Sequence, residues 1–83
     1  MAQFQWSWLY EAADMGQVIR EARTAARLTQ AELADRLGVS RRTIVRLESG
    51  DQGAAIETAI QALGECGVAL AAIPRGSTVR VQR

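Results

Sequence analysis

Apolar and polar positions alternate with the period of an α-helix over most of residues 14–63. In the first such stretch, apolar residues recur at intervals of three and four, and arginine, glutamate and threonine lie between them. An apolar stripe at this spacing covers one face of a helix. The apolar residues are Val18, Ile19, Ala22, Ala25 and Ala26. The pattern predicts a helix over about residues 14–27.

Capping signals predict where the second helix begins and ends. Thr29 is followed three residues later by Glu32, the spacing of a capping box, in which each side chain accepts a hydrogen bond from the other residue's backbone N–H. Gly38 can adopt the left-handed conformation that closes a helix without a Cβ penalty. The second helix should therefore cover residues 30–37.

A third and a fourth helix follow. Ser40 is an N-cap candidate, and residues 41–48 carry apolar positions at helical spacing before a Ser-Gly pair ends the pattern. After a polar loop at 50–53, apolar residues lie at i, i+3, i+4 and i+7, which predicts a fourth helix with one buried stripe. These residues are Ile56, Ala59, Ile60 and Leu63.

The pattern changes after Gly67. An apolar run bounded by Gly67 and Pro74 contains β-branched residues at both ends, and a proline commonly ends a strand because it cannot donate to a ladder. The run predicts one strand, formed by Val68, Ala69, Leu70, Ala71, Ala72 and Ile73. Residues 78–81 alternate weakly, and they either fold back on this strand as a hairpin or form a frayed end.

The first ten residues hold aromatic side chains spaced two apart: Phe4, Trp6, Trp8 and Tyr10. On an extended segment these side chains share one face. This arm either covers the domain's own core or contacts a second subunit or a partner protein, because bare indoles in water promote aggregation. The chain is thus expected to comprise an arm at 1–13, a helical domain at 14–66 and a C-terminal segment at 67–83.

Composition narrows the classes of function. With 83 residues, 48% hydrophobic and 23% charged, the chain is one folded domain that buries roughly 60–65% of its unfolded surface, so a dimer would help it. Cys66 is the single cysteine and there is no histidine, which excludes an internal disulfide, zinc-finger spacing and His-based catalysis. We expect no enzyme, metal or cofactor. No apolar run approaches the ~20 residues that span a bilayer, so a cytoplasmic location without membrane contact is expected.

The net charge of +1 hides an uneven distribution. Residues 18–50 hold seven arginines against four acidic residues, and all ten basic residues of the chain are arginine. Arginine forms planar two-point hydrogen bonds to guanine or phosphate that lysine cannot match. The arginine-rich middle therefore favours nucleic acid as a partner, and a GC-rich genome is the alternative explanation of the bias.

The second and third predicted helices meet the requirements of a helix-turn-helix, in which two helices joined by a short turn cross closely at one point. Ala34 is the small residue at the crossing, and Gly38 lies in the turn four residues later. The apolar residues expected to face the core are Leu33, Leu37, Val39, Ile44 and Leu47. Each match alone is weak, but together at fixed offsets they indicate this motif.

The stretch from Leu28 to Gly50, LTQAELADRLGVSRRTIVRLESG, closely resembles the XRE (Cro-type phage repressor) helix-turn-helix family, and the resemblance extends over about residues 15–64. It implies a mainly α fold, a four-helix lambda-repressor-like DNA-binding domain. With a C-terminal β-strand after the fourth helix, the chain is also similar to the HipB-like antitoxins. Their dimers join these strands in a small intermolecular sheet, repress their own operon and bind a kinase-type toxin. The resemblance thus implies a homodimer paired through 68–73 and a HipA-like kinase toxin as protein partner.

The resemblance also implies which residues read bases. In the family the recognition helix enters the major groove by its N-terminal end, and the positions that reach base edges correspond to Arg41, Arg42 and Arg46. Val45 lies on the same flank and could meet a thymine methyl group. Since arginine pairs with guanine O6 and N7, G·C pairs are expected in each half-site. The alternative is an ordinary solvated, charged face.

A second set of residues is expected at the DNA phosphates: Gln30, Ser40, Thr43, Arg27 and Arg36. Gln30 matches the family's glutamine at the start of the second helix, where its amide and nearby backbone N–H groups face a phosphate. Ser40 could instead be only an N-cap and Thr43 only solvated. Arg27 and Arg36 could equally form surface ion pairs.

Glu48 matches a Glu-x-Gly sequence that is common in the family at this point. The resemblance implies a structural role for Glu48 at the helix end, in a buried pair with Arg20 or Arg23. Arg23 fits best, and such a pair would remove Arg23 from the DNA contacts.

The sequence therefore predicts a sequence-specific DNA-binding transcriptional repressor that binds a pseudo-palindromic operator in double-stranded DNA. Within that class, the antitoxin of a HipBA-like toxin–antitoxin system is preferred. One alternative is a stand-alone phage-type or restriction-controller regulator. Another is a protein-interaction module that has lost DNA binding, which is disfavoured because the recognition face carries three arginines without acidic neighbours.

Overall fold

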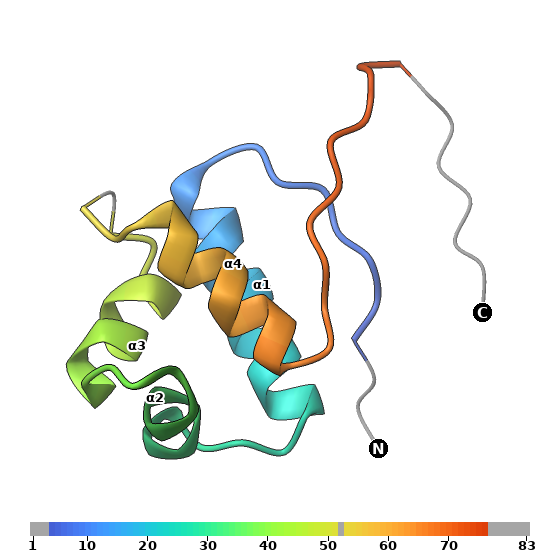
Figure 1. The fold of residues 1–83 in the computed structure, drawn as a ribbon. Coiled ribbons are helices and arrows are strands. Elements are labelled where there is room, and N and C mark those ends of the chain that lie inside the picture. The colour runs from blue at the N-terminus through green and yellow to red at the C-terminus, as the bar shows by residue number, and fades with distance from the viewer. Residues whose placement is uncertain (1–3, 52, 77–83) are drawn as a thin grey trace.

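The computed structural model describes residues 4–51 and 53–76, and these residues form four helices around one core (Figure 1). The helices are α1 (Ala12–Ala25), α2 (Gln30–Leu37), α3 (Arg41–Glu48) and α4 (Ile56–Glu65). The mainly α class expected from the sequence is confirmed. The predicted bounds of α2 and α3 agree with the structure, whereas those of α1 are shifted.

α1 begins and ends two residues earlier than the predicted 14–27. At its start, the Asp14 carboxylate accepts hydrogen bonds from the backbone N–H groups of Tyr10 and Glu11, at 2.9 and 3.1 Å. At its end, Arg27 adopts a left-handed conformation with φ of 61°. A non-glycine residue in this conformation is uncommon, so the apolar periodicity carried no sign that the helix stops here.

The capping signals of α2 and α3 are both formed. The Thr29 hydroxyl accepts from the Glu32 N–H at 3.0 Å, and the Glu32 carboxylate accepts from the Thr29 N–H at 2.9 Å. Gly38 closes α2 with φ of 69°. The Ser40 hydroxyl then accepts from the Thr43 N–H at 3.2 Å and begins α3. Local side chains thus set the angle at which α3 leaves the turn.

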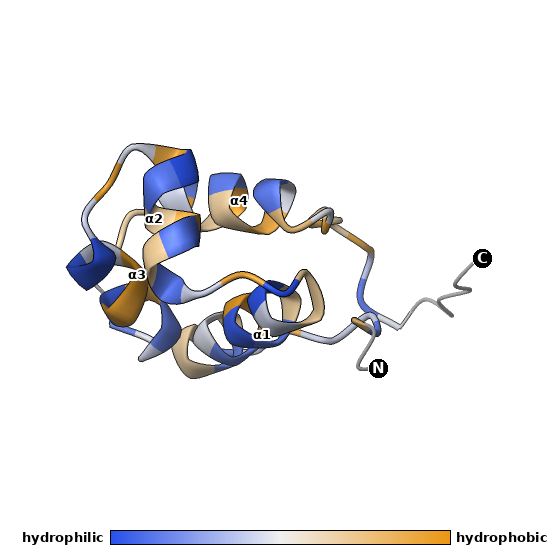
Figure 2. Ribbon diagram, turned by 90° about the horizontal axis from the view of Figure 1, so that it is seen from below, coloured by the Kyte–Doolittle hydropathy of each residue, from blue (hydrophilic) through white to orange (hydrophobic). Residues whose placement is uncertain are grey.

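The core takes one fully buried large side chain from each helix: Ile19, Leu33, Ile44 and Leu63. Ala34, at the crossing of α2 and α3, is also buried, whereas Leu37 and Val39 are partly buried against this core. Hydrophobic and hydrophilic stretches alternate along each helix (Figure 2). The helix-turn-helix is therefore packed on α1 and α4 through one continuous apolar cluster.

The buried face of α4 differs from the predicted stripe. Ile56 and Ile60 are 70% and 49% exposed, and the buried residues are Ala59, Ala62 and Leu63. Periodicity could not choose between these faces because alanine and isoleucine are both apolar. The small side chains let α4 approach α1 and α2 closely and leave the two isoleucines outside.

The N-terminal arm, 4–10, and the C-terminal segment, 68–73, run beside each other along one edge of the molecule (Figure 1). Phe4 and Val68 pack against the core, whereas Trp6 and Trp8 remain 48% and 44% exposed. No strand ladder occurs among residues 4–51 and 53–76. The predicted strand would pair between two copies, so a single chain does not test it, and the 78–81 hairpin lies outside the described residues. No helix within the described ranges is long and apolar enough to cross a membrane.

Candidate DNA-binding interface

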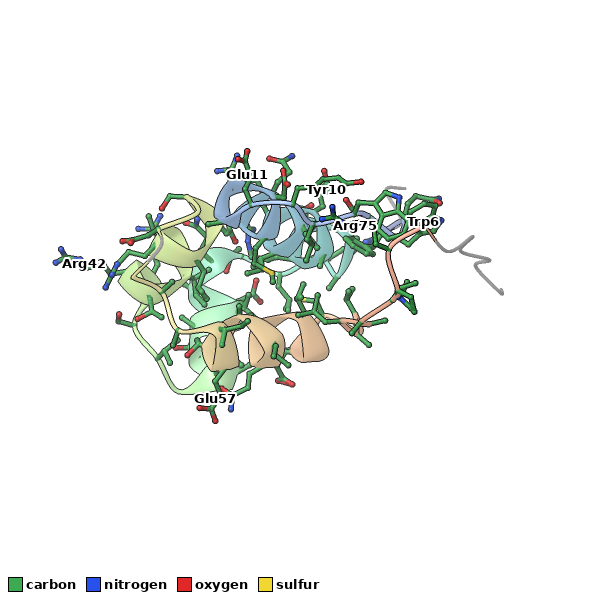
Figure 3. All side chains as sticks on the ribbon, turned by 90° about the horizontal axis from the view of Figure 1, so that it is seen from above. Trp6, Tyr10, Glu11, Arg42, Glu57 and Arg75 are labelled. Carbon is green, nitrogen blue, oxygen red and sulfur yellow. The ribbon has the colours of Figure 1, made fainter. Side chains whose placement is uncertain are left out.

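α3 presents one charged side to solvent and one apolar side to the core. Ile44 and Leu47 are buried, and the four residues expected to reach base edges are all exposed: Arg41, Arg42, Val45 and Arg46. Figure 3 shows Arg42 projecting from α3 away from the body of the protein. We call these four residues the α3 outer face. The structure brings the predicted base-reading residues together on it.

A chain of hydrogen bonds connects the α3 outer face to the interior. Arg41 donates from Nη2 to Oε1 of Gln30 at 3.1 Å, and Gln30 donates from Nε2 to Oε1 of Glu48 at 3.2 Å. Arg23 completes the chain by donating to both Glu48 oxygens, from Nε at 2.6 Å and from Nη2 at 3.1 Å. The chain joins α1, α2 and α3, so it holds both helices of the motif in one orientation.

Glu48 is the buried charge at the centre of this chain, with its side chain 1% exposed. The hydrogen bond with Glu48 raises the pKa of Arg23, which also donates from Nη1 to the Leu28 carbonyl at 2.9 Å. Arg20 lies 3.6 Å from Glu48 but is mostly exposed. The expected Glu48–Arg23 pair is confirmed. Arg23 is consequently occupied inside the protein.

The side-chain amide of Gln30, which was expected to face a DNA phosphate, lies between two other side chains of the protein. Both ends of its amide are engaged by protein side chains, Arg41 on one end and Glu48 on the other. A side chain amide carries two donor hydrogens, so one N–H of Gln30 is left for another acceptor. Contact between Gln30 and a DNA phosphate stays a prediction.

Arg46 forms an ion pair that the sequence reading did not include. Its Nε lies 2.8 Å from Oδ2 of Asp51, and this hydrogen bond lowers the pKa of the Asp51 carboxyl. The expectation of three arginines without acidic neighbours is wrong for Arg46. The signal was present in the sequence, because Asp51 follows Arg46 by five residues, but only the turn after α3 brings the two side chains together.

The remaining candidates lie around the motif. Ser40 is the N-cap of α3, and its hydroxyl lies 3.1 Å from that of Thr43. Arg36 is exposed near the end of α2, and Arg27 is exposed at the turn that follows α1. Contact of these four residues with phosphates stays a prediction.

Two glycines position the end of α3 against α1, a role that the sequence analysis gave to neither of them. A Cβ on Gly16 would lie 2.5 Å from the Glu48 carbonyl oxygen, and a Cβ on Gly50 would lie 2.8 Å from Cα of Ala13. The backbone of α1 therefore touches the end of α3 directly. A glycine inside a helical pattern, as at Gly16, is the signal that could have indicated this contact.

A sequence profile of the HTH_3 helix-turn-helix family matches residues 19–73. The chain belongs to this XRE-type helix-turn-helix family. The family is one of DNA-binding transcription regulators, typically without enzymatic activity. Over 36 residues the chain is 56% identical to an uncharacterized HTH-type transcriptional regulator of Methanothermobacter thermautotrophicus. That alignment covers 43% of this chain and 52% of the relative, so the chain spans about half of the relative's length.

Solved structures with a similar fold include two HipB complexes. A HipB–O2 20mer complex has a TM-score of 0.77 at 20% identity, covering 86% of this chain and 99% of the other. A HipA–HipB–O2–O3 complex has a TM-score of 0.75 at 18% identity, covering 84% and 99%. At these identities the likeness is one of fold. This chain thus has a HipB-like fold.

Proposed function

We propose that this XRE-family chain is a sequence-specific transcriptional repressor whose α3 lies in the major groove of a pseudo-palindromic operator. The observation that carries the proposal is the α3 outer face, which the Arg41–Gln30–Glu48–Arg23 chain holds in a fixed orientation. A recognition helix discriminates bases only if its side chains are presented in a fixed register. An ordinary solvated face would not need a buried ion pair behind it.

Arg42 is the residue best placed to read a base. Among the described residues it makes no hydrogen bond or ion pair, and it projects outward (Figure 3). Its guanidinium donors are available for a two-point contact with guanine O6 and N7. Arg41 reads from its anchored position, and Val45, 40% exposed, contacts a thymine methyl group. We assign the phosphate contacts to five further residues: Gln30, Ser40, Thr43, Arg27 and Arg36.

The test of base reading starts with a duplex selected by the wild-type protein from a random library, alongside a scrambled duplex of the same composition. Replacing Arg42 by alanine should weaken binding to the selected duplex by ~1–3 kcal/mol and relax the preference at one base pair. Arg75→Ala is the matched control, because Arg75 lies on the side of the molecule away from Arg42 (Figure 3). Equal losses on both duplexes for Arg42→Ala would contradict base reading.

We further propose that two copies pair through 68–73 and bind half-sites about one helical turn apart, ~10–11 bp. Support comes from the exposed apolar side chains of this segment, Leu70 at 38% and Ile73 at 40%. Leu70→Asp should then shift sedimentation toward the monomer. Ile60→Asp, at an exposed apolar position on α4, is the control. A footprint with a single unrepeated site would contradict the dimer on DNA.

Within the family, the HipB-like fold supports a more specific role as the antitoxin of a HipBA-like system that autoregulates its operon. The partner would be a HipA-like kinase toxin, and the aromatic arm with Trp6, Trp8 and Tyr10 exposed offers a surface for it. Co-expression with a kinase-type gene adjacent to this one should relieve the growth arrest caused by that gene alone, and the two proteins should co-purify. Absence of such a gene, or no relief, would favour a stand-alone phage-type or restriction-controller regulator.

A further inference from the structure

Asp51 is held firmly at the end of the recognition helix. Its backbone N–H donates to the Arg46 carbonyl at 3.2 Å, and its own carbonyl accepts from the Ala54 N–H at 3.0 Å. Its Oδ1 accepts from the Gly53 N–H at 2.8 Å, which leaves Oδ2 directed to Arg46 at 2.8 Å. Two backbone hydrogen bonds thus fix the Asp51 main chain, and the Gly53 N–H orients its carboxylate toward Arg46.

The pair engages Arg46 through one nitrogen only. Within residues 4–51 and 53–76 the hydrogen bond of the Arg46 side chain uses Nε, and neither Nη1 nor Nη2 is bonded. The two terminal nitrogens carry the remaining donors of the planar guanidinium. The Asp51 carboxylate therefore neutralises Arg46 and orients its plane without using the donors that a guanine would need.

The three arginines of the α3 outer face differ in this respect. Arg41 is held by the neutral amide of Gln30, and Arg42 makes no hydrogen bond among the described residues. Among the described residues, Arg46 is the one of the three that is paired with a negatively charged side chain. Affinity for any DNA sequence depends on positive charges facing phosphates. Discrimination between sequences depends on oriented donors facing base edges.

We infer that Asp51 is a specificity-determining residue, which makes Arg46 a reader of bases instead of an anchor for phosphates. A carboxylate next to the guanidinium repels a phosphate, whereas the uncharged O6 and N7 of guanine remain good acceptors for Nη1 and Nη2. The inference rests on the proposed function, since it requires Arg46 to face the groove. It adds a residue outside the helix-turn-helix that sets the ratio of specific to random binding.

The central experiment compares Asp51→Asn with the wild type on the selected duplex and on the scrambled duplex, over a series of salt concentrations. The asparagine keeps an oxygen for the Gly53 N–H, removes the charge and puts an NH2 group in the place of the oxygen that accepts from Arg46. We expect affinity for the scrambled duplex to rise, with a salt slope steeper by about 1. The ratio of selected to scrambled affinity should fall by about threefold to tenfold. Glu57→Gln, which removes one carboxylate on a different side from Arg42 (Figure 3), should leave the ratio unchanged.

A second variant separates orientation from charge. A Cβ on Gly53 would lie 3.0 Å from Nη2 of Arg46 and 3.2 Å from Oδ1 of Asp51, so Gly53→Ala displaces the pair and keeps both charges. It should lower the ratio without changing the salt slope. In an Arg46→Ala background, Asp51→Asn should leave the preference at every base pair unaltered, which a purely structural role would not predict.

The possible outcomes distinguish a failure of the proposed function from a failure of the proposed role of Asp51. If the wild type selects no sequence from the random library, the proposed function fails and this inference fails with it. If the wild type does select a sequence but Asp51→Asn keeps its ratio and its salt slope, base reading stands and the role of Asp51 is overturned. A higher ratio in Asp51→Asn would also overturn it, since Asp51 would then merely withhold Arg46 from DNA.

Discussion

The α2–α3 region and the two terminal segments, 4–10 and 68–73, differ in how far the chain itself satisfies their polar groups and covers their apolar side chains. In α2–α3 the ends are capped, the central charge is paired, and no buried side-chain nitrogen or oxygen of the described residues lacks a partner. The terminal segments instead leave tryptophan, tyrosine and leucine side chains in solvent. A single chain therefore suffices to build the helix-turn-helix motif. The terminal segments, in contrast, keep apolar surface that a second molecule could cover.

The largest expected effect comes from breaking the charge at the centre of the α2–α3 region. Glu48→Ala should lower the free energy of unfolding by ~3–5 kcal/mol, because it leaves the largely buried Arg23 guanidinium without its carboxylate partner. Urea denaturation measures this loss. Glu65→Ala, at the exposed end of α4, is the control. Arg23→Ala should cost a similar amount, and the double variant should cost less than the two losses together; strict additivity would argue against the pair.

Two glycine-to-alanine substitutions in helices should change the free energy of unfolding in opposite directions. Gly16→Ala should destabilise the protein by ~1–3 kcal/mol, since its Cβ would overlap the Glu48 carbonyl. Gly64→Ala should stabilise it by ~0.5–1 kcal/mol, because no atom lies within 4 Å of the added Cβ and alanine is the better helix former. Thermal melts of both variants check the pair. A stable Gly16→Ala protein would mean that α1 does not clamp the end of α3.

Trp6→Ala tests how much the N-terminal arm contributes to the stability of the single chain. Trp6 is half-exposed and contacts Trp8 edge to face, with ring centroids 5.5 Å apart, so its removal from the monomer should cost only about 1 kcal/mol. Its larger effect should appear as weaker self-association or weaker toxin binding, measured by sedimentation and co-purification. A loss as large as that of Glu48→Ala would show that the arm belongs to the core.

The smallest effect concerns pH and the cap of α2. The hydrogen bonds from Thr29 lower the pKa of Glu32. A carboxyl with a lowered folded-state pKa contributes stability that is complete above its unfolded pKa and is lost as the pH falls through the folded value. The melting temperatures of wild type and Glu32→Gln should therefore differ at pH 6, and the difference should shrink as the pH falls below ~4. A difference that stays the same from pH 6 down to about pH 3 would contradict this.

Much of the motif could be predicted because its signals are local. Thr29 with Glu32, Gly38 and Ser40 each act within four residues, so reading the sequence yields the bounds of α2 and α3. The Glu48–Arg23 pair was accessible only through the resemblance, because 25 residues separate the two side chains. The end of α1 and the buried face of α4 could not be predicted. The first depends on a left-handed arginine, and the second on which apolar side chains permit close packing.

By itself the sequence determined a helix-turn-helix with an arginine-rich third helix, since caps, turn glycine and apolar spacing all act over one helical turn, and its resemblance to the XRE family supplied the family. Only the tertiary structure decided how each arginine is held. Arg41 rests on an amide anchored to a buried carboxylate, Arg42 is free among the described residues, and Arg46 is paired with Asp51. These partners come from other helices or from the turn after α3, and their distances depend on how the helices cross.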